Sequence, residues 1–481
     1  MGEIPAFYSV KWFEAMRKNT EAPISGGVAG GSVEGSVMGL ERSGGVVPTE
    51  NVRQPGNGEE RARTVKPFGI DKRVVWEAYR HVKANRGAAG IDDQSIEMFE
   101  ANLKNNLYRM WNRMSSGSYF PPAIRLVEIP KKTGGMRTLG IATVEDRIAQ
   151  TVAKIYIEPA LERLFHPDSY GYRPGKSALQ AIGATRERCW KYDWLVEFDI
   201  ERAFDELDWS LLLKAVRKHV KERWAVMYIE RWLKAPFVQA DGTQVPRSKG
   251  VPQGSVIGPV MMNLFMHYCF DRWMQEKHPY NPFARYCDDA VVHCSSKLQA
   301  HWKLVAIGKR LEECGLRLNL QKSGIVYCQS GEHREAHART QFTFLGYTFR
   351  SRGAKDRYGR MFRSFLPAVS LEATKKMLRT IKSWKLSRQT PASISELAAR
   401  YNPILRGWLN YYGHFYHSAL LKVFDRFEAA LVRWVRRKYK KLARHEGRSF
   451  HWLWRVARRQ PQLFVHWRAY RRAGGRAMGA V

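Results

Sequence analysis

Apolar residues recur along the chain with two spacings, and each spacing predicts a different kind of element. Helical spacing marks the segments 74–86, 96–114, 143–165, 177–192 and 256–273. Strand-like alternation or short apolar runs mark 124–130, 138–141, 194–199, 283–293, 318–323 and 342–349. Three more helices are expected over 373–384, 394–412 and 419–442. The pattern thus predicts strands mixed with helices up to about residue 350, and helices after it.

The first part of the chain lacks this periodicity. A tract rich in Gly, Ser, Val and Glu runs from Ile24 to Gly58, and such a composition cannot bury enough apolar surface to offset the entropy of ordering. We therefore expect residues 1–66 to form a flexible extension, with order beginning near Pro67.

The charge of the chain predicts a polyanionic partner. Its 481 residues carry 80 Lys and Arg against 45 Asp and Glu, a formal net charge of +35. Such self-repulsion is best tolerated when the usual partner is a polyanion, so nucleic acid is expected. No apolar run approaches the roughly eighteen residues of a membrane span, which makes an anionic bilayer the weaker candidate.

The cysteines and the N-terminal residues indicate the cellular compartment in which the protein is expected. The six cysteines form no Cys-x-x-Cys pair and no regular framework, which predicts a reducing environment and no zinc module. The N-terminus lacks the apolar core of a secretory signal and the Ser or Thr of a myristoylation site. A cytoplasmic, nucleoid-associated protein is expected.

Three aspartates stand where predicted strands end or turn. Asp288 and Asp289 occupy the turn of the 283–293 hairpin, and Asp199 ends the strand that begins at Trp194. Aspartate is common in turns and at helix caps, so each position has an ordinary structural explanation. If antiparallel strands bring the three together, their oxygens suit Mg²⁺, and two such ions can hold the attacking and leaving oxygens of a phosphoryl transfer. The residues alone leave both explanations open.

Two further segments carry polar residues that suit a nucleotide. Lys131 and Arg137 project from a Gly-Gly turn, where they are either solvated charges or ligands that close over a triphosphate. The loop 250–255 places Gln253 in a tight turn shaped by Gly and Pro, ahead of the 256–273 helix. Its amide can hydrogen-bond a base or sugar, or the loop is simply the entrance to a core helix.

The order of these motifs resembles one known family. After the basic hairpin come Phe-Asp-Ile…Phe-Asp (198–205), Gly-Val-Pro-Gln-Gly-Ser (250–255), Tyr-Cys-Asp-Asp (286–289), Leu-Asn-Leu-Gln-Lys-Ser (318–323) and Phe-Leu-Gly-Tyr-Thr-Phe (344–349). With the segment 401–413, Tyr-Asn-Pro-Ile-Leu-Arg-Gly-Trp-Leu-Asn-Tyr-Tyr-Gly, the chain from about Pro67 onward resembles the group II intron-encoded reverse transcriptase/maturase family.

The resemblance implies an α+β fold, a right-hand polymerase followed by helices. Fingers and palm, with an antiparallel sheet, would occupy residues 67–350. An α-helical thumb or maturase domain would occupy 351–442, and a basic nucleic-acid-binding tail 443–481.

The resemblance also implies roles at the matching positions. Asp199, Asp288 and Asp289 would be catalytic and, with Ile200, would bind two Mg²⁺ ions, for which Mn²⁺ can substitute. One ion would lower the pKa of a primer 3′-hydroxyl and the other would hold the triphosphate. Deoxynucleotide contacts would come from Lys131, Arg137, Phe204, Gln253 and Lys322. Phe204 would exclude a 2′-hydroxyl, and Lys322 would lie near the leaving pyrophosphate.

Three departures from the family pattern leave the predicted metal ligands in place. Cys287 replaces the more usual Ala, a small apolar change with open consequences for fidelity or primer placement. Asp93 replaces a usual turn glycine. Ser255 and Gly258 vary a loop that often reads Gln-Gly-Gly or ends in Ser-Pro.

The last third of the chain mixes basic with aromatic residues. Basic helical faces are most often merely solvated, but the aromatic residues and the total charge favour an RNA-binding surface here. The residues expected to contact nucleic acid are Arg406, Arg433, Arg436, Arg437, Lys440 and Lys441. No His-Asn-His-like cluster or cysteine pair follows, so the DNA endonuclease module of many relatives is expected to be absent.

The function expected from the resemblance is that of an RNA-directed DNA polymerase that also promotes intron splicing and retrohoming. Its partners would be group II intron RNA, an RNA template with a DNA primer, target DNA and deoxynucleoside triphosphates. Two alternatives stay open: a domesticated reverse transcriptase used in repair or defence, and a splicing-only RNA-binding maturase. The intact Asp199, Asp288, Asp289 and Phe204 argue against an idle polymerase site.

Overall fold

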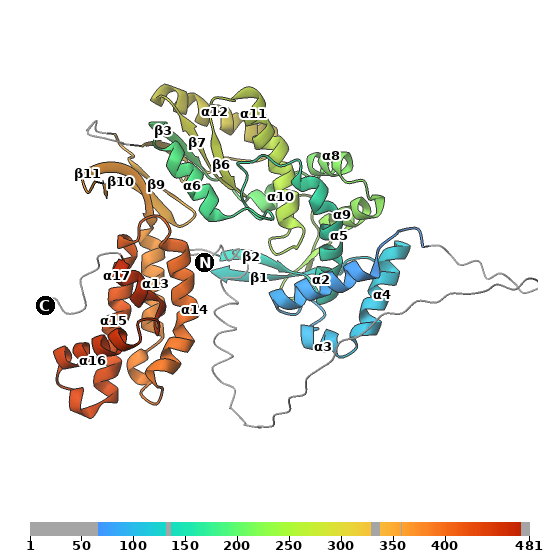
Figure 1. Cartoon of the computed structure of the whole chain (residues 1–481). Helices are drawn as coiled ribbons and strands as arrows, with labels where there is room; N and C mark the ends of the chain where they lie inside the picture. The colour runs from blue at the N-terminus through green and yellow to red at the C-terminus, as the bar shows by residue number, and fades with distance from the viewer. Residues whose placement is uncertain (1–65, 131–135, 329–336, 357, 473–481) are drawn as a thin grey trace, which may run out of the picture.

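The computed structural model describes residues 66–130, 136–328, 337–356 and 358–472 of the chain. Along these residues a group of helices with a small sheet comes first, a central sheet follows, and a helical region comes last (Figure 1). The predicted extension, up to residue 65, and Lys131 lie outside the described residues.

The N-terminal part combines helices with a four-stranded sheet of order β2-β1-β4-β5. Its helices are α2 (Lys72–Asn85), α3 (Ile96–Glu100), α4 (Leu103–Ser116) and α5 (Val144–Glu162). Its strands are β1 (Ile124–Pro130), β2 (Met136–Ile141), β4 (Phe237–Val238) and β5 (Gln244–Val245). Strand β1 pairs antiparallel with β2 and parallel with β4, so this sheet is mixed.

The prediction of one helix over 96–114 is wrong. The chain leaves helical geometry at Asn102, with φ −132° and ψ 45°, and starts a second helix there. The side-chain amide of Asn106 donates to the carbonyl of Phe99 over 2.9 Å and ties the two helices together. A polar residue that bonds to backbone offers the chain an alternative to a continuous helix, which periodicity does not detect.

The central sheet is antiparallel throughout and has the order β6-β7-β3-β8. Its strands are β3 (Trp194–Phe198), β6 (Phe283–Tyr286), β7 (Asp289–Cys294) and β8 (Gly324–Tyr327). Successive side chains point to opposite faces of a strand, so Val196 joins one apolar core and Leu195 another. Both faces are therefore covered, which fixes the register of the strands.

The helices of this central part are α6 (Ala178–Arg188), α7 (Ala203–Glu206), α8 (Trp209–His219), α9 (Arg223–Lys234), α10 (Gly258–Met266), α11 (Arg272–Lys277) and α12 (Lys297–Glu313). Between α10 and α11 lies a π-helical segment, η1 (His267–Asp271), so the three form one continuous rod. The predicted helix over 256–273 corresponds to this rod.

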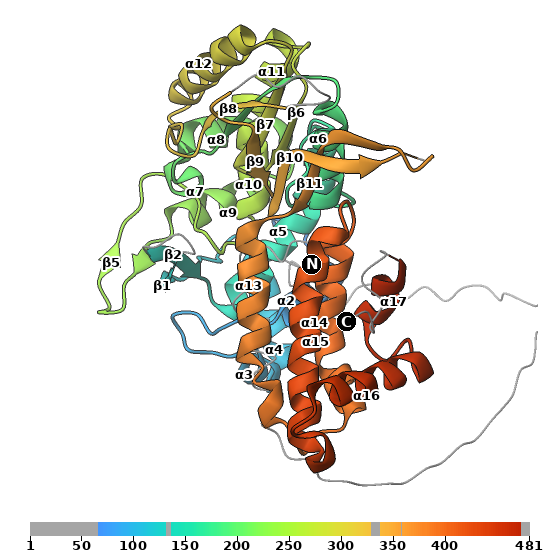
Figure 2. The same cartoon turned by 90° about the vertical axis from the view of Figure 1, so that its left-hand side faces the viewer.

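A three-stranded sheet, of order β11-β10-β9, connects the central sheet to the last helices. Its strands are β9 (Gln341–Phe344), β10 (Tyr347–Lys355) and β11 (Met361–Val369). The paired β10 and β11 project from the body of the molecule (Figure 2). The expected boundary at residue 350 falls inside β10, and helices begin only at Leu371.

The helical region contains α13 (Leu371–Ser383), α14 (Ile394–Tyr412), α15 (Ser418–Lys438), α16 (Glu446–Arg459) and α17 (Val465–Arg472), with short 3-10 turns at Leu386–Arg388 and Lys440–Leu442. Residues 443–481 were expected to form a separate tail. Instead, α16 and α17 fold onto the same region, because Leu453, Phe464 and Trp467 are buried in the core that α14 and α15 form. Apolar burial thus extends the helical unit past residue 442.

The predicted α+β class, with antiparallel strands followed by a helical region, is confirmed. All six cysteines are buried and free. Of the helices in the described ranges, none combines the length and the apolar character needed to cross a membrane.

Candidate active site

Antiparallel pairing brings the three predicted aspartates to one end of the central sheet. Phe198 of β3 pairs with Ala290 of β7, so Asp199, the next residue, comes opposite Asp289. Tyr286 pairs with Asp289 across the hairpin, which leaves Asp288 in the two-residue turn between β6 and β7. Carboxylates that are about ninety residues apart in the sequence therefore share one sheet edge.

The charges at this edge influence one another. Asp288 is half-buried, and desolvation, followed by the negative charge of Asp199, raises the pKa of its carboxyl above the ordinary value. The ammonium of Lys322 donates to Asp199 Oδ2 over 2.8 Å, and this hydrogen bond raises the pKa of the lysine. Lys322 thus lies beside the carboxylate of Asp199, and its role near a substrate stays a prediction.

Asp199 is held by the segment that contains Lys322. The side-chain amide of Asn319 donates to Asp199 Oδ2 over 3.3 Å, and its backbone N–H donates to the carbonyl of Asp199 over 2.9 Å. The hydroxyl of Ser323 accepts from the backbone N–H of Asp199 over 3.2 Å. Asn319 and Ser323 belong to the 318–323 motif, but no role was predicted for either from the sequence.

The oxygen atoms at this end of the sheet suit a metal ion that the substrate helps to bind. In the part of the chain that the structure describes, no group of three His, Cys, Asp or Glu side chains is arranged to hold a metal ion by itself. Mg²⁺, however, is commonly bound by one or two carboxylates with water and substrate phosphates completing the shell. The carboxylate oxygens at this end of the sheet fit an ion whose shell the substrate completes, because a bound cation would offset the burial and the nearby charge of Asp199 that raise the pKa of Asp288.

Ile200 occupies a different position from the aspartates. Its side chain is buried, and the residue forms an isolated antiparallel bridge with Leu318. Because an isoleucine side chain has no donor atom, only the backbone carbonyl of Ile200 is available as a metal ligand.

Backbone hydrogen bonds join the three segments that carry Arg137, Phe204 and Gln253 into one surface, called here the nucleotide wall. Val251 N–H donates to the carbonyl of Phe204 over 2.7 Å, which ties the 250–255 loop to α7. Two residues along, the carbonyl of Gln253 accepts from the N–H of Gly140 in β2, also over 2.7 Å. The strand that bears Arg137, the loop with Gln253 and the helix with Phe204 are therefore adjacent.

Glycine at position 254 makes this junction possible. Gly254 has φ +116°, and a Cβ there would overlap the carbonyl oxygen of Gly140. Beside it, Gln253 is half-buried, as are Phe204 and Arg137. Phe204 packs against the edge of the main core, which limits the movement of its ring.

Two of the departures from the family pattern sit in left-handed backbone. Asp93 has φ +53° and Cys287 has φ +61°, a region that normally favours glycine. The side chain of Asp93 accepts a hydrogen bond from Arg125 over 2.7 Å, which stabilises the unusual conformation. The position that usually holds a turn glycine thus keeps its glycine-like geometry.

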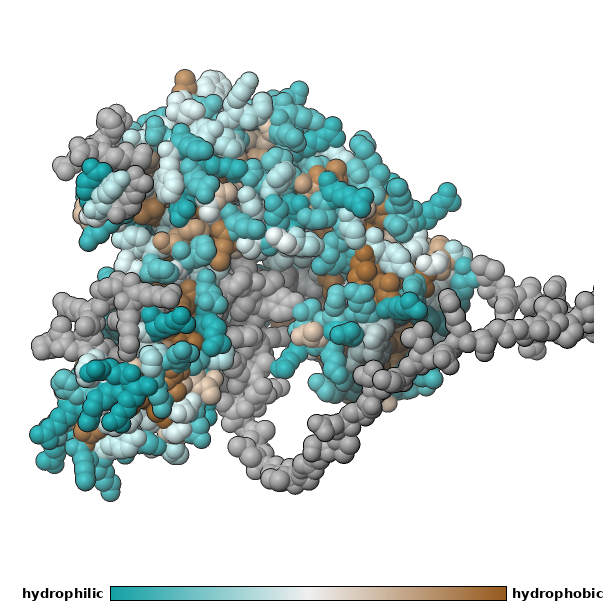
Figure 3. Space-filling view, in the orientation of Figure 1, coloured by the Kyte–Doolittle hydropathy of each residue, from teal (hydrophilic) through white to brown (hydrophobic). Residues whose placement is uncertain are grey.

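The predicted nucleic-acid contacts of the helical region differ in exposure. Five of them are exposed: Arg406, Arg433, Arg437, Lys440 and Lys441. Arg436 is half-buried and donates to the carbonyl of Ala443 over 3.1 Å and to the carboxylate of Glu446 over 3.3 Å. Hydrophilic residues cover much of the visible surface over α15 and α16 (Figure 3).

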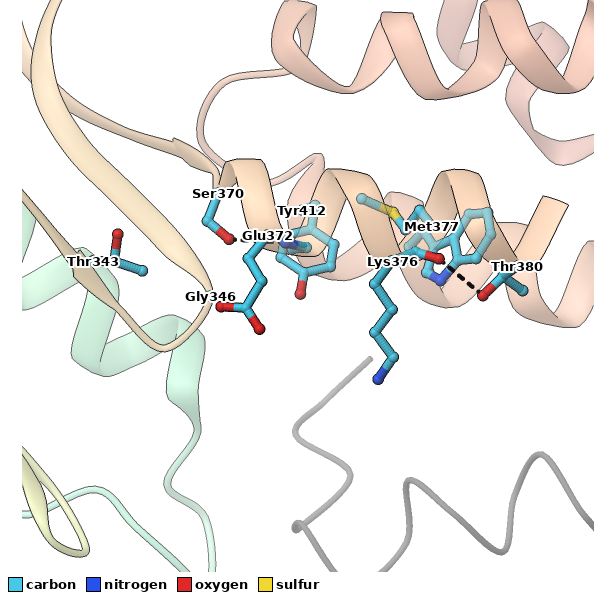
Figure 4. A pocket seen from close by; sticks show the side chains of 10 residues that line it. Thr343, Gly346, Ser370, Glu372, Lys376, Met377, Thr380 and Tyr412 are labelled. Atoms are coloured by element: carbon cyan, nitrogen blue, oxygen red, sulfur yellow. Dashed lines mark hydrogen bonds between the residues drawn. The ribbon is translucent and has the colours of Figure 1, made fainter. Parts of the chain in front are cut away.

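A cavity of about 220 Å³ lies where the β9–β10 turn meets α13 and α14. Glu372 and Lys376 extend from α13 toward it, beside Gly346 and Tyr412 (Figure 4). No predicted site residue among those described lines this cavity. It is a feature of the junction between sheet and helices, separate from the carboxylate edge.

Comparisons with known proteins agree with the two-part architecture. A family model described as reverse transcriptase (RNA-dependent DNA polymerase) matches residues 129–349. A second model, described as the group II intron maturase-specific domain, matches residues 374–452. The first range contains all three aspartates and the second contains α14 and α15.

Several curated relatives resemble the chain over part of its length. Protein YkfC of Escherichia coli is 34% identical over 214 residues, 42% of this chain and 54% of that protein. The group II intron-encoded protein LtrA of Lactococcus lactis is 28% identical over 198 residues, 40% of this chain and 32% of that protein. The putative COX1/OXI3 intron 1 protein of Saccharomyces cerevisiae is 26% identical over 199 residues, 41% of this chain and 24% of that protein.

The chain therefore spans about half, or less, of the length of these relatives. A solved telomerase structure from Candida albicans aligns over 80% of this chain and 69% of that chain with a TM-score of 0.40 and 10% identity. The two domain matches and the intron-protein relatives establish the family. The chain belongs to the group II intron-encoded reverse transcriptases and maturases.

Proposed function

We propose that this chain is an RNA-directed DNA polymerase that extends a DNA primer on an RNA template. The observation that carries the proposal is the meeting of Asp199, Asp288 and Asp289 at one edge of the central sheet, inside the reverse transcriptase match. Phosphoryl transfer needs positioning and charge neutralisation more than covalent chemistry from the protein, and carboxylates grouped in this way would hold the metal ions that supply the neutralising charge.

The chain's own residues divide the work. Asp199, Asp288 and Asp289, with the carbonyl of Ile200, would hold two Mg²⁺ ions. When bound, such ions activate a primer 3′-hydroxyl and neutralise triphosphate charge. Asp288 must be ionised to bind a metal ion. Desolvation and the charge of Asp199 raise the pKa of Asp288, and the positive charge of Lys322 opposes this by lowering it. Lys322, whose side chain is 61% exposed, offers positive charge toward the leaving pyrophosphate.

The nucleotide wall would bind the incoming deoxynucleotide. Arg137 supplies a forked cation for the triphosphate, Gln253 a side-chain amide for the base or sugar, and Phe204 a ring against the sugar. Support comes from the backbone hydrogen bonds that keep β2, α7 and the 250–255 loop together. Lys131, which lies outside the described residues, keeps its predicted role beside Arg137.

The helical region would bind structured intron RNA, and through it promote splicing and retrohoming. Its match to the maturase-specific domain and its exposed basic residues support this part of the proposal. Phosphate contacts dominate RNA affinity, so Arg406, Arg433, Arg437, Lys440 and Lys441 are the expected contacts, with Arg436 in a supporting position.

Primer extension tests the polymerase proposal directly. Wild-type protein should extend oligo(dT) on poly(rA) with Mg²⁺ and dTTP, and Asp288→Ala with Asp289→Ala should abolish extension. If the wild-type protein and the variant extend the primer equally, or if neither extends it, the assignment of the catalytic aspartates is contradicted. Accelerated splicing of the cognate intron RNA by the same Asp variants would separate the maturase role from the polymerase role.

A further inference from the structure

A fully buried arginine lies directly beneath the aspartate turn. Arg285, in β6, has a side chain with no exposure to solvent, and so has its partner Asp271. Arg285 donates from Nε to Asp271 Oδ1 and from Nη2 to Asp271 Oδ2, each over 2.6 Å. This two-pronged ion pair fixes the orientation of the guanidinium plane.

The remaining nitrogen of Arg285 reaches the turn itself. Its Nη1 donates to the backbone carbonyl of Cys287 over 2.8 Å and to Asn263 Oδ1 over 3.1 Å. Its Nη2 also donates to the hydroxyl of Ser169 over 2.8 Å. The guanidinium is therefore saturated with acceptors, and one of them belongs to the two-residue turn that carries Asp288.

The turn needs such support because its backbone is unusual. Cys287 is the first residue of the turn and has φ +61°, as in a type II′ hairpin, where glycine is the normal residue. Gly171 packs against it so closely that a Cβ there would lie 2.5 Å from the N atom of Cys287. The side chain of Asn263 donates to the carbonyl of Gly171 over 2.7 Å, so the same asparagine supports the turn from both sides.

The π-helical segment explains how Asn263 and Asp271 reach the same arginine. An uninterrupted α-helix advances roughly 100° per residue, so positions eight apart would differ by roughly 80°. A π-turn holds one extra residue, so the two positions are oriented as if they were about seven residues apart in an α-helix. Their directions around the helix axis then differ by only about 20°. The segment His267–Asp271 begins after Asn263 and ends at Asp271, and thus turns both side chains to the face that meets Arg285.

We propose that Arg285, held by Asp271 and Asn263, is a positioning residue that fixes the Cys287–Asp288 turn and with it the carboxylates of the active edge. This inference rests on the polymerase function proposed above. Arg285 does not touch substrate; it acts by holding the Cys287 carbonyl, so it determines where Asp288 and Asp289 present their oxygens.

The test variant removes both charges at once, Arg285→Met with Asp271→Asn, because a single buried charge left without its partner would strongly destabilise the protein. The matched control is Arg188→Met with Asp168→Asn. Arg188 pairs with Asp168 over 2.7 and 2.8 Å and donates to the carbonyl of Phe283 at the other end of β6. The control thus loses a partly buried ion pair, between the end of α6 and the loop before it, that contacts the far end of the same strand, and neither of its side chains bonds to the aspartate turn.

Three measurements distinguish positioning from simple stability: thermal unfolding, steady-state extension of oligo(dT) on poly(rA), and Mn²⁺ binding followed by electron paramagnetic resonance. For the test variant, kcat should fall by about 10²-fold, since displacement of reacting groups by about 1 Å has that effect. Its KM for template–primer should stay unchanged, and its Mn²⁺ binding should weaken. The control should keep kcat and Mn²⁺ binding near wild type.

The results for the test variant and the control decide whether Arg285 is a positioning residue. If the test variant and the control lose kcat and Mn²⁺ binding equally, or if neither loses them, Arg285 is structural only and the inference is overturned. If the test variant does not fold, Arg285→Lys is judged by the same criteria, since it keeps a cation opposite Asp271 but lacks the nitrogen that reaches Cys287. Failure of the wild-type protein to extend a primer would instead refute the proposed function.

Discussion

The central sheet and the C-terminal helical region use charge in opposite ways. At the sheet edge the charged groups are held in place: Asp199 by Asn319 and Ser323, and the aspartate turn by a buried arginine. In the helical region, basic side chains such as Arg433 and Arg437 stand exposed on a core made of apolar residues. Under the proposed function, the first arrangement would fix positions for chemistry, and the second would supply a positive field for a polyanion.

The contrast shows where a substitution should change rate and where it should change affinity. Groups held by several partners cannot move without displacing the atoms they position, so their loss acts on kcat. Exposed cations interact with phosphates one by one, so their loss acts on binding and on its salt dependence.

The largest effect is expected at the sheet edge. Asp288→Asn with Asp289→Asn should lower primer extension by roughly three orders of magnitude or more, because metal ions contribute several kcal/mol of charge stabilisation. RNA affinity, measured by filter binding, should stay near wild type because these residues lie outside the helical region. A large loss of RNA affinity in this variant would contradict the division between the two regions.

The helical region should give the next largest effect. Replacing Arg433, Arg437 and Lys441 by Gln should weaken binding of structured RNA by about 10–10²-fold and lower the salt slope of binding by roughly 2, at about 0.7 per contact. The measurement is filter binding between low and moderate salt. The matched control is Lys309→Gln, Lys277→Gln and Lys218→Gln, three lysines of the central part, which should leave the slope unchanged. An equal drop for both sets would mean that only net charge matters.

A buried histidine of the central sheet should make stability depend on pH. Burial lowers the pKa of His293 to about 3, so below the ordinary value near 6.5 the unfolded chain binds a proton that the folded chain does not. Stability is therefore lost as pH falls, by about 2 kcal/mol between pH 7 and pH 5 from this residue. In His293→Leu, urea unfolding at the two pH values should show that much less loss. His81→Leu, at an exposed site, should leave the pH dependence unchanged.

The smallest effect is expected at the loop beside the carboxylates. Gly254→Ala should raise the KM for dTTP by about tenfold, because the new Cβ displaces the loop from Gly140 and moves Gln253. Gly242→Ala is the control, since Gly242 also has positive φ, +86°, but faces open space. Steady-state extension at varied dTTP measures both. Equal KM values for the two variants would mean that backbone strain, not the close approach, accounts for the change.

Much of the fold followed from local pattern. The strand 124–130 and the helix 394–412 were predicted with their observed bounds from the spacing of apolar residues in the sequence. The break at Asn102 and the docking of α16 and α17 were missed, because the first depends on a side chain that bonds to backbone and the second on burial against distant helices.

The candidate site formed by the three aspartates was likewise predicted only in part from the sequence. The sequence by itself determined the order of the motifs, the family to which they belong, and the aspartates at 199, 288 and 289 that are proposed to carry the chemistry. Only the tertiary structure decided how they meet, through the register of β3 with β7, the hydrogen bond from Lys322 to Asp199, and the burial of Arg285 beneath the turn. The physical reason is that periodicity records which face of an element is buried, whereas register and buried ion pairs depend on partners far away in the chain.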